Sequence, residues 1–287
     1  MISINNSEVS MQDNTVTGNG ITSGTVLTDT FEMRYFRFGS GDRTMVILPG
    51  LSVQSVMGSA EAVAQEYAAF TDDFTVWVFD RREDLPSRYT VSEMAADTAE
   101  ALEKLGLRDI CLFGASQGGM ISLCIAQDHP ELISKLILGS SACRVSEKQY
   151  EVISGWVSLA KQKDRAELYL SFGEKLYPEH VFEAYRPVFE SMAETVTDDE
   201  LNRFIILAEG TKGFDVSDKM DLISCPVLSI DADDDMVLLP EAGQLIADKF
   251  SNKPGFSRYT YSGLGHAVFD TAAPEYQQRM LRFFLGE

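Results

Sequence analysis

The chain has few basic residues, no long apolar run and no recognisable secretory signal. Its 287 residues include 24 lysines and arginines against 44 aspartates and glutamates, so the net charge is −20. A surface of that sign repels phosphate backbones and anionic lipid head groups, so we expect neither a nucleic-acid nor a membrane partner. No apolar stretch approaches the roughly 20 residues of a membrane helix. The first residues lack the basic start and apolar core of a secretory signal.

Cysteine is also scarce, and its spacing excludes the common thiol motifs. Cys111, Cys124, Cys143 and Cys225 each lie in or beside an apolar run, and no two form a CxxC pair. This pattern predicts buried, reduced thiols in a cytoplasmic protein. Hydrophobic residues (45%) and charged residues (24%) are near the globular average, which excludes disorder and fibrous repeats.

Short apolar runs alternate along the chain with longer segments of helical spacing. We expect strands at 31–37, 44–49, 74–80, 109–113, 134–139, 226–231 and 257–262, and helices at 58–70, 91–105, 117–128, 240–250 and 274–285. Several of the strand runs are apolar throughout, which suits parallel strands covered on both faces. The predicted fold class is α/β, with a mostly parallel sheet flanked by helices.

Two regions depart from this alternation. Residues 142–222 contain repeated amphipathic patterns and no convincing strand, which predicts a helical insertion; the alternative is ordinary helices of the main fold. Residues 1–24 are polar, and we interpret them as a leader or edge segment. The predicted core is then formed by residues 25–141 and 223–287.

A G-x-S-x-G pattern lies between an expected strand and an expected helix. Gly114, Ser116 and Gly118 form it, and a serine in such a tight turn projects its hydroxyl from the end of the sheet. The two glycines remove side chains that would clash in the turn. The backbone N–H of Gln117 then lies at a helix N-terminus, which favours a developing negative charge.

A serine nucleophile needs a base, and the chain has three histidines. His129 precedes a proline at the end of the helix that follows the serine, about one helix length away, and His180 lies in the insertion. His266 lies in a glycine-rich loop between the last expected strand and the last expected helix. Because loops at strand ends carry function, His266 is the candidate base.

A histidine base needs a carboxylate to orient it. Asp231, Asp233, Asp234 and Asp235 all follow one expected strand. Crowded aspartates also occur in solvated turns and in cation sites. A calcium loop would have glycine at its sixth position and glutamate at its twelfth, and both are missing here, so we expect no metal.

These three pieces follow the chain order serine, aspartate, histidine, and in this the sequence resembles the α/β-hydrolase family. The resemblance covers residues 25–287 and includes an insertion where the family commonly carries a helical cap. It implies Asp235 as the triad acid, and a shift of one residue would choose Asp234. It also implies the backbone N–H groups of Leu51 and Gln117 as oxyanion donors.

Three further positions carry the resemblance or depart from it. The loop that supplies Leu51 reads Pro49-Gly50-Leu51, with proline where the family often has histidine. Asp80 and Arg81 resemble the family's Asp-x-Arg, with a second arginine, Arg82, in place of the usual glycine, and we interpret them as structural.

The resemblance implies a serine hydrolase that cleaves a small ester, thioester or related acyl substrate and needs no cofactor. Non-hydrolytic chemistry on the same scaffold (lyase, acyltransferase or cofactor-free oxygenase) and a catalytically silent ligand receptor are the alternatives. Aromatic residues of the insertion, either core or pocket lining, are Tyr150, Trp156, Tyr169 and Phe172. The sequence leaves the substrate and the oligomeric state open.

Overall fold

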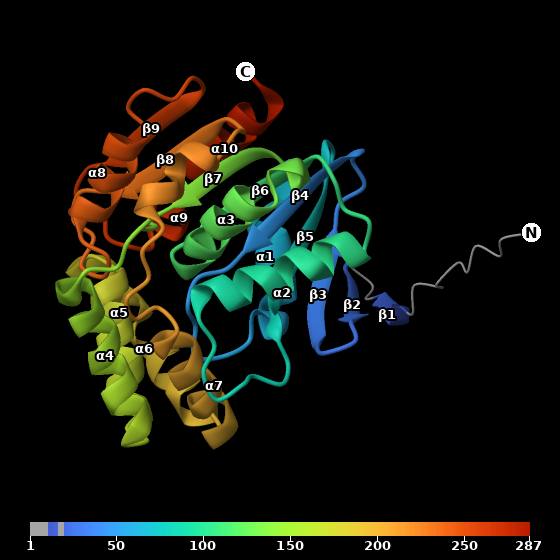
Figure 1. Ribbon diagram of the computed structural model, residues 1–287. Helices are drawn as coiled ribbons and strands as arrows, with labels where there is room; N and C mark the ends of the chain where they lie inside the picture. Colours follow the sequence, from blue (N-terminus) through green and yellow to red (C-terminus); the bar gives the residue numbers. More distant parts are fainter. Residues whose placement is uncertain (1–10, 17–19) are drawn as a thin grey trace, which may run out of the picture.

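The computed structural model describes residues 11–16 and 20–287, and its centre is one nine-stranded sheet (Figure 1). Across the sheet the strand order is β1, β2, β3, β5, β4, β6, β7, β8, β9. The bounds are Met11–Val16 (β1), Thr22–Leu27 (β2), Glu32–Phe38 (β3), Arg43–Leu48 (β4), Phe74–Arg82 (β5), Ile110–Ala115 (β6), Ile133–Gly139 (β7), Val227–Ala232 (β8) and Phe256–Tyr261 (β9). The strands from β5 to β9 across the sheet are parallel, so the predicted mostly parallel sheet is confirmed.

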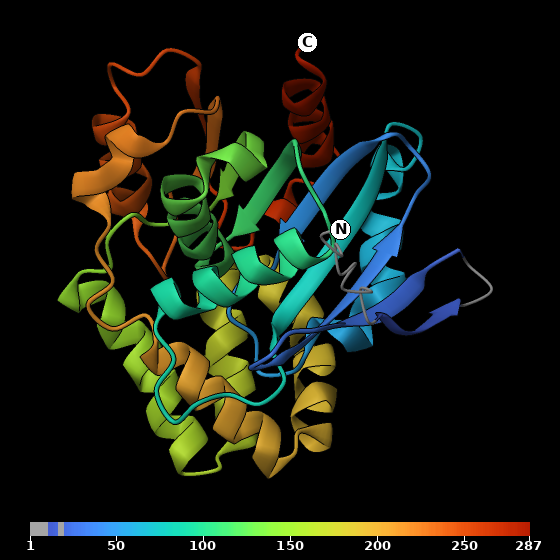
Figure 2. The same cartoon turned by 45° about the vertical axis from the view of Figure 1, so that its right-hand side comes forward.

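The polar start of the chain contributes an antiparallel edge. β1 pairs with β2, β2 with β3, and β3 with β5, each antiparallel, and Figure 2 shows β1 and β2 at one end of the sheet. We predicted no strand in 1–24, and part of that segment lies outside the described residues. Within β2 only Gly24 and Val26 are buried, so its apolar pattern is too weak to indicate a strand.

The bounds of the helices are Ala60–Glu66 (α1), Val91–Lys104 (α2), Gln117–Asp128 (α3), Glu147–Lys161 (α4), Arg165–Leu176 (α5), Glu179–Thr195 (α6), Asp198–Glu209 (α7), Pro240–Lys249 (α8), Val268–Thr271 (α9) and Glu275–Leu285 (α10). Five of the helices, α1, α2, α3, α8 and α10, match the expected positions to within a few residues, whereas α9 and the separate bounds of α4 to α7 were not predicted. α2 begins after Thr90, whose hydroxyl accepts from the Glu93 N–H (3.3 Å) while the Glu93 carboxylate accepts from the Thr90 N–H (2.6 Å). In the described ranges, no helix is both long and apolar enough to cross a membrane.

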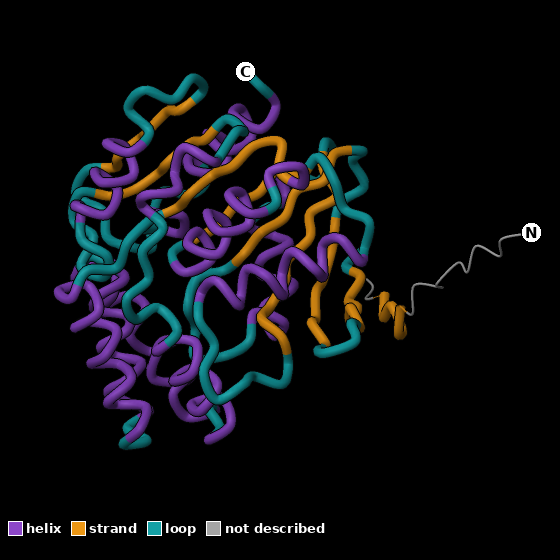
Figure 3. Tube along the Cα trace, in the orientation of Figure 1, coloured by secondary structure: helices purple, strands orange, loops and turns teal. Residues whose placement is uncertain are grey.

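Helices cover both faces of the sheet (Figure 3). One core contains residues of α2, α3 and α8, among them Met120, together with Leu48 of β4. The other contains residues of α9 and α10, among them Tyr276, together with Ile47 of β4. Neighbouring residues of one strand thus enter opposite cores, as expected for a strand buried on both faces.

Helices α4 to α7 form the run between β7 and β8. At its base, Arg144 and Asp215 form an antiparallel bridge, with hydrogen bonds from the Val145 N–H to Phe214 O (2.8 Å) and from the Val216 N–H to Cys143 O (2.9 Å). Phe204 and Leu207 of α7 belong to the same core as Leu48 and Met120. The inserted helices therefore share one hydrophobic core with the sheet and α3.

The four cysteines are buried and unpaired, as the sequence predicted. Burial raises the pKa of the Cys111 thiol, and it raises those of Cys124, Cys143 and Cys225 to about 11. All four thiols are therefore protonated and unreactive at neutral pH.

Candidate functional site

Ser116 lies in a tight turn between β6 and α3. Its backbone has φ 52° and ψ −118°, a conformation that residues with a side chain rarely adopt. A Cβ on Gly114 would lie 2.3 Å from Ser122 Oγ, and one on Gly118 would lie 1.9 Å from the Leu48 carbonyl oxygen. Both glycines of the motif are therefore required by close approach, and they leave the half-buried Ser116 hydroxyl at the end of the sheet.

His266 lies in the loop between β9 and α9, and its ring faces Ser116. Nε2 of His266 lies 2.9 Å from Ser116 Oγ, and Nδ1 lies 2.7 Å from Asp235 Oδ2. The residue is 2% exposed. The loop is held by the Ala267 N–H, which donates to Leu176 O of α5 (3.0 Å).

Of the four aspartates after β8, Asp235 is the one that reaches His266. Its Oδ1 accepts from the N–H groups of Val237 (2.8 Å) and Leu238 (2.9 Å), which leaves Oδ2 for the imidazole. Burial alone would raise the pKa of this carboxyl, but His266 and these hydrogen bonds hold it below its usual value. The carboxylate is therefore ionised at neutral pH and fixes the orientation of the ring.

The other three aspartates have separate partners. Asp231 pairs with Arg258 (2.8 Å), and Asp233 accepts from Ser262 Oγ and the Gly263 N–H (both 2.7 Å). Asp234, the alternative acid, is exposed to solvent.

The two backbone groups implied as oxyanion donors lie beside Ser116. Gln117 is the first residue of α3, so its N–H has no acceptor within the helix. A Cβ on Gly50 would lie 3.2 Å from Ser116 Cβ, so the loop that carries Leu51 lies directly against the serine. The N–H of Leu51 has no acceptor among residues 11–16 and 20–287.

Asp80 and Arg81 lie at the end of β5, behind this loop. Asp80 accepts from Ser55 Oγ (2.5 Å) and pairs with Arg203 of α7 (3.1 Å). Burial alone would raise the pKa of Asp80, but Arg203, Ser55 and Arg81 hold it below its usual value. Sequence reasoning did not find Arg203, because its partners lie about 120 residues away and no local motif links them.

A cavity of about 870 Å³ opens over Ser116 and His266. From the inserted helices, Trp156, Tyr169 and Phe172 line it, and the first two are also buried in the core. Tyr150 is not part of the wall; Lys212 lies over its ring instead.

The sequence did not predict two further parts of the cavity wall. The exposed apolar residues Tyr185, Val188 and Met192 of α6 lie along it. Tyr177 and Asp270 also line it, and the Tyr177 hydroxyl donates to Asp270 Oδ2 (2.6 Å). Burial raises the pKa of Asp270 although this hydrogen bond opposes the shift.

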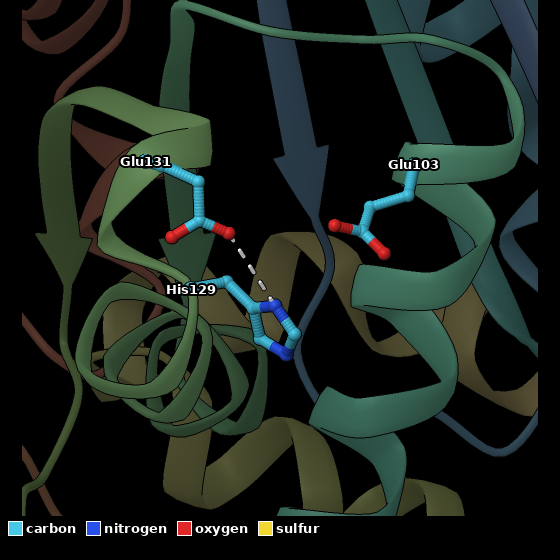
Figure 4. A group of neighbouring side chains, drawn as sticks. All are labelled: Glu103, His129 and Glu131. Carbon is cyan, nitrogen blue, oxygen red and sulfur yellow. Dashed lines mark ion pairs between the residues drawn. The ribbon is translucent and has the colours of Figure 1, made fainter.

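The other two histidines lie away from Ser116. His180 is exposed at the start of α6. His129 follows α3 at the end opposite to Ser116, and Figure 4 shows it with Glu131 (3.7 Å) and Glu103. The possible metal-ligand atoms of these three side chains lie within 4.8 Å of one another, and both glutamates are exposed. In the described part of the chain, this is the single group of three or more such side chains close enough to hold a metal ion.

Comparison with known proteins finds relatives that are named as hydrolases. The chain is 24% identical over 229 residues to the serine hydrolase BPHL of Mus musculus, covering 76% of this chain and 72% of that protein. It is 26% identical over 252 residues to a putative carbamate hydrolase, RutD, of Serratia proteamaculans, covering 78% and 87%.

Solved structures with the same fold align over almost the whole chain. An alpha/beta hydrolase enzyme, MGS-M2, from a Medee basin deep-sea metagenome library has a TM-score of 0.80 at 20% identity, covering 92% of this chain and 97% of that one. The enol-lactonase of Burkholderia xenovorans LB400 has a TM-score of 0.76 at 18% identity, covering 92% and 100%.

The family assignment comes from the match to a family model. A model of the alpha/beta hydrolase fold matches residues 43–273, a range that starts at β4 and includes the turn of Ser116 and the loops of Asp235 and His266. Because this match spans well over half of the sequence, the chain is an enzyme of the alpha/beta hydrolase fold family.

Proposed function

We propose that this enzyme is a serine hydrolase that cleaves carboxylic esters, thioesters or related acyl compounds through an acyl-enzyme. The observation that carries the proposal is the pair of short contacts of His266, 2.9 Å to Ser116 Oγ and 2.7 Å to Asp235 Oδ2. A serine becomes a nucleophile at neutral pH when a base accepts its proton, and the base works when a carboxylate fixes its tautomer.

The reaction follows from these positions. Nε2 of His266 accepts the Ser116 proton as Oγ attacks the substrate carbonyl, and Asp235 stabilises the imidazolium that forms. The backbone N–H groups of Leu51 and Gln117 donate to the oxyanion, and one such donor is typically worth about 3 to 4 kcal/mol. His266 then protonates the leaving group. In the second half, it activates water that releases the acid and restores Ser116.

The cavity supports an apolar substrate. Most of the side chains that line it are aliphatic or aromatic, including Trp156, Phe172 and Met120, so an apolar acyl or alcohol group gains by leaving water. The cavity of about 870 Å³ can hold an acyl group larger than acetyl. We therefore expect turnover of acyl esters to rise with acyl chain length until the chain fills the cavity, and to fall for longer chains.

We also propose that the chain is divided into a cap, a catalytic core and an edge segment. Residues 142–222 act as a cap over Ser116, because α4 to α6 supply much of the cavity wall. Residues 25–141 and 223–287 form the catalytic core, and 1–24 an edge. The four buried, unpaired cysteines support a cytoplasmic location.

Labelling with a fluorophosphonate probe tests the proposed nucleophile. Ser116→Ala should abolish labelling and lower ester turnover by roughly four to six orders of magnitude with the fold intact, because the covalent intermediate cannot form. Ser158→Ala, an exposed serine of α4, is the matched control and should label as the native protein does.

The outcomes separate the alternatives. Retained labelling of Ser116→Ala would place the nucleophile elsewhere. A native protein that neither labels nor turns over a panel of acyl esters of increasing length would favour the silent receptor. Labelling without hydrolysis of any ester would point to non-hydrolytic acyl chemistry.

A further inference from the structure

Arg81 is a buried cation that contacts both loops around Ser116. Its Nη2 donates to Pro49 O (2.7 Å) and to Gln117 Oε1 (2.9 Å), and the residue is 5% exposed. Burial lowers the pKa of its guanidinium to about 10, so the side chain still carries its charge at neutral pH. One nitrogen therefore joins the loop of Leu51 to the turn of Ser116.

Burying the Arg81 guanidinium costs free energy, and its contacts must offset that cost. Desolvating a guanidinium disfavours the charged form, and such groups are normally paired with a carboxylate. Within the described ranges, Arg81 forms no ion pair, since the nearby Asp80 carboxylate is taken by Arg203 and Ser55. Its hydrogen bonds go to two neutral oxygens.

The side chain of Gln117 extends the connection to the inserted helices. Its Oε1 accepts from Arg81, and its Nε2 donates to Leu207 O of α7 (2.7 Å). The residue is 1% exposed, so both contacts are protected from water. Arg203, also on α7, donates to the Arg81 carbonyl (3.1 Å). Helix α7 is therefore hydrogen-bonded both to Arg81 and to Gln117.

This connection joins the two oxyanion donors, which belong to separate segments. Leu51 follows β4 and Gln117 begins α3, and a hole for the oxyanion requires both N–H groups about 2.7 to 3.1 Å from one point. Fixing Pro49 O and the Gln117 side chain to the same guanidinium limits how far the two donors can separate.

We propose that Arg81 and the side chain of Gln117 are positioning residues. They keep the Leu51 and Gln117 N–H groups directed at one oxyanion position, and they connect both groups to α7. The inference rests on the proposed serine hydrolase function. It assigns part of the transition-state geometry to the inserted helices, in addition to their part in the cavity wall.

Two substitutions at Gln117 separate the two contacts. Gln117→Met has a similar shape and loses both hydrogen bonds. Gln117→Glu still accepts from Arg81 but cannot donate to Leu207 O. We expect kcat on a p-nitrophenyl ester to fall roughly 30- to 100-fold in the first and roughly 10-fold in the second, below the loss when a donor itself is removed.

The control lies on the same helix. Gln127 is also a buried glutamine of α3, and its Nε2 donates to Val216 O (3.4 Å) outside the helix. Gln127→Met should lower the Tm while leaving kcat unchanged. Arg81→Met should match Gln117→Met in kcat; where it fails to fold, the Gln117 variants decide.

Readouts beyond activity distinguish positioning from folding. If the proposal holds, KM stays within threefold while kcat falls, and affinity for a phenylboronic acid, which forms a tetrahedral adduct with serine, falls in parallel with kcat. Gln117→Met with kcat within threefold of native and only a lower Tm would overturn it. A native-like kcat for Gln117→Glu would overturn the part that involves α7.

This test and the test of the proposed function can fail separately. A native protein that is not labelled at Ser116 removes the function on which the inference rests. A native protein that is labelled and hydrolyses esters, with Gln117→Met equally active, removes the inference alone.

Discussion

Asp235 and Asp234 are neighbours in sequence with opposite surroundings. Asp235 is 6% exposed and faces His266, whereas Asp234 is exposed and its N–H donates to Leu264 O (3.3 Å). The two N–H groups that hold Asp235 Oδ1 leave its other oxygen for the imidazole. A neutral amide in that position would reverse the hydrogen bond and favour the wrong tautomer of His266.

Substitution at these two positions should therefore have unequal effects. We expect Asp235→Asn to lower kcat about 10⁴-fold and Asp234→Asn less than tenfold, measured on the same ester. If Asp234→Asn were the crippling change, the solvent-facing carboxylate would be the one that matters in catalysis.

Asp270 is a second residue whose environment predicts a measurable effect. Its raised pKa means that the folded protein binds a proton more tightly there than the unfolded chain does, so stability falls as pH rises through the range between the two values. Asp270→Asn keeps an acceptor for the Tyr177 hydroxyl and removes the desolvated charge. It should stabilise the protein at neutral pH by roughly 1 kcal/mol.

The pH dependence of unfolding tests the sign of the stability change in Asp270→Asn. Urea unfolding at neutral pH and near pH 4 should show the advantage of Asp270→Asn shrinking in acid, where the native carboxyl is increasingly protonated in both states. An advantage that grows in acid would contradict this assignment.

At the scale of elements, the sequence predicts the parallel strands well and the edge poorly. β4, β6 and β8 are largely buried, mostly apolar runs whose pattern is local, and each was expected to within two residues at either end. The β1–β2 edge is polar, so pairing with β3, not its own composition, makes it a strand.

The same distinction applies to the candidate site. Ser116 and His266 could be predicted because a turn motif and a glycine-rich loop mark them locally. Arg203 and Leu207 could not, because their role depends on α7 packing against the turn, a contact between distant segments. Choosing Asp235 over Asp234 required a family register in addition to the local pattern.

The glycines of two helices offer a matched comparison. A Cβ at Gly118, at the start of α3, would lie 1.9 Å from Leu48 O, whereas one at Gly155, inside α4, meets nothing within 4 Å. Gly118→Ala should destabilise by about 2 to 3 kcal/mol because backbone must shift. Gly155→Ala should stabilise by about 0.5 to 1 kcal/mol. Urea unfolding of both checks this, and a shift of equal sign in the two variants would refute the steric argument.

The molecule as a whole has two cores, one on each face of the sheet, and the inserted helices share one of them. Three segments of the candidate site also contact these helices: Gln117 donates to Leu207 O, Gln149 to Leu238 O, and the Ala267 N–H to Leu176 O. The inserted helices and the rest of the chain are therefore tied together as one folding unit, and we expect a single unfolding transition.

The net charge of −20 acts on this whole unit. Mutual repulsion of like charges destabilises a compact state, and salt screens it. Raising NaCl from low concentration to about 0.3 M should therefore raise the Tm by a few degrees, as measured by calorimetry. KCl should act equally, and a Tm that falls with salt would mean that exposed ion pairs outweigh the repulsion.

Because all four cysteines are buried, the surface of the native protein offers no thiol that can react with thiol reagents. Their raised pKa values keep them from reacting, so a cysteine introduced at an exposed position becomes the single labelling site. Val188, 56% exposed on α6 along the cavity wall, is such a position. A fluorophore on Val188→Cys would brighten or dim as a ligand enters, which makes the protein a ready scaffold for an optical sensor of its own substrate.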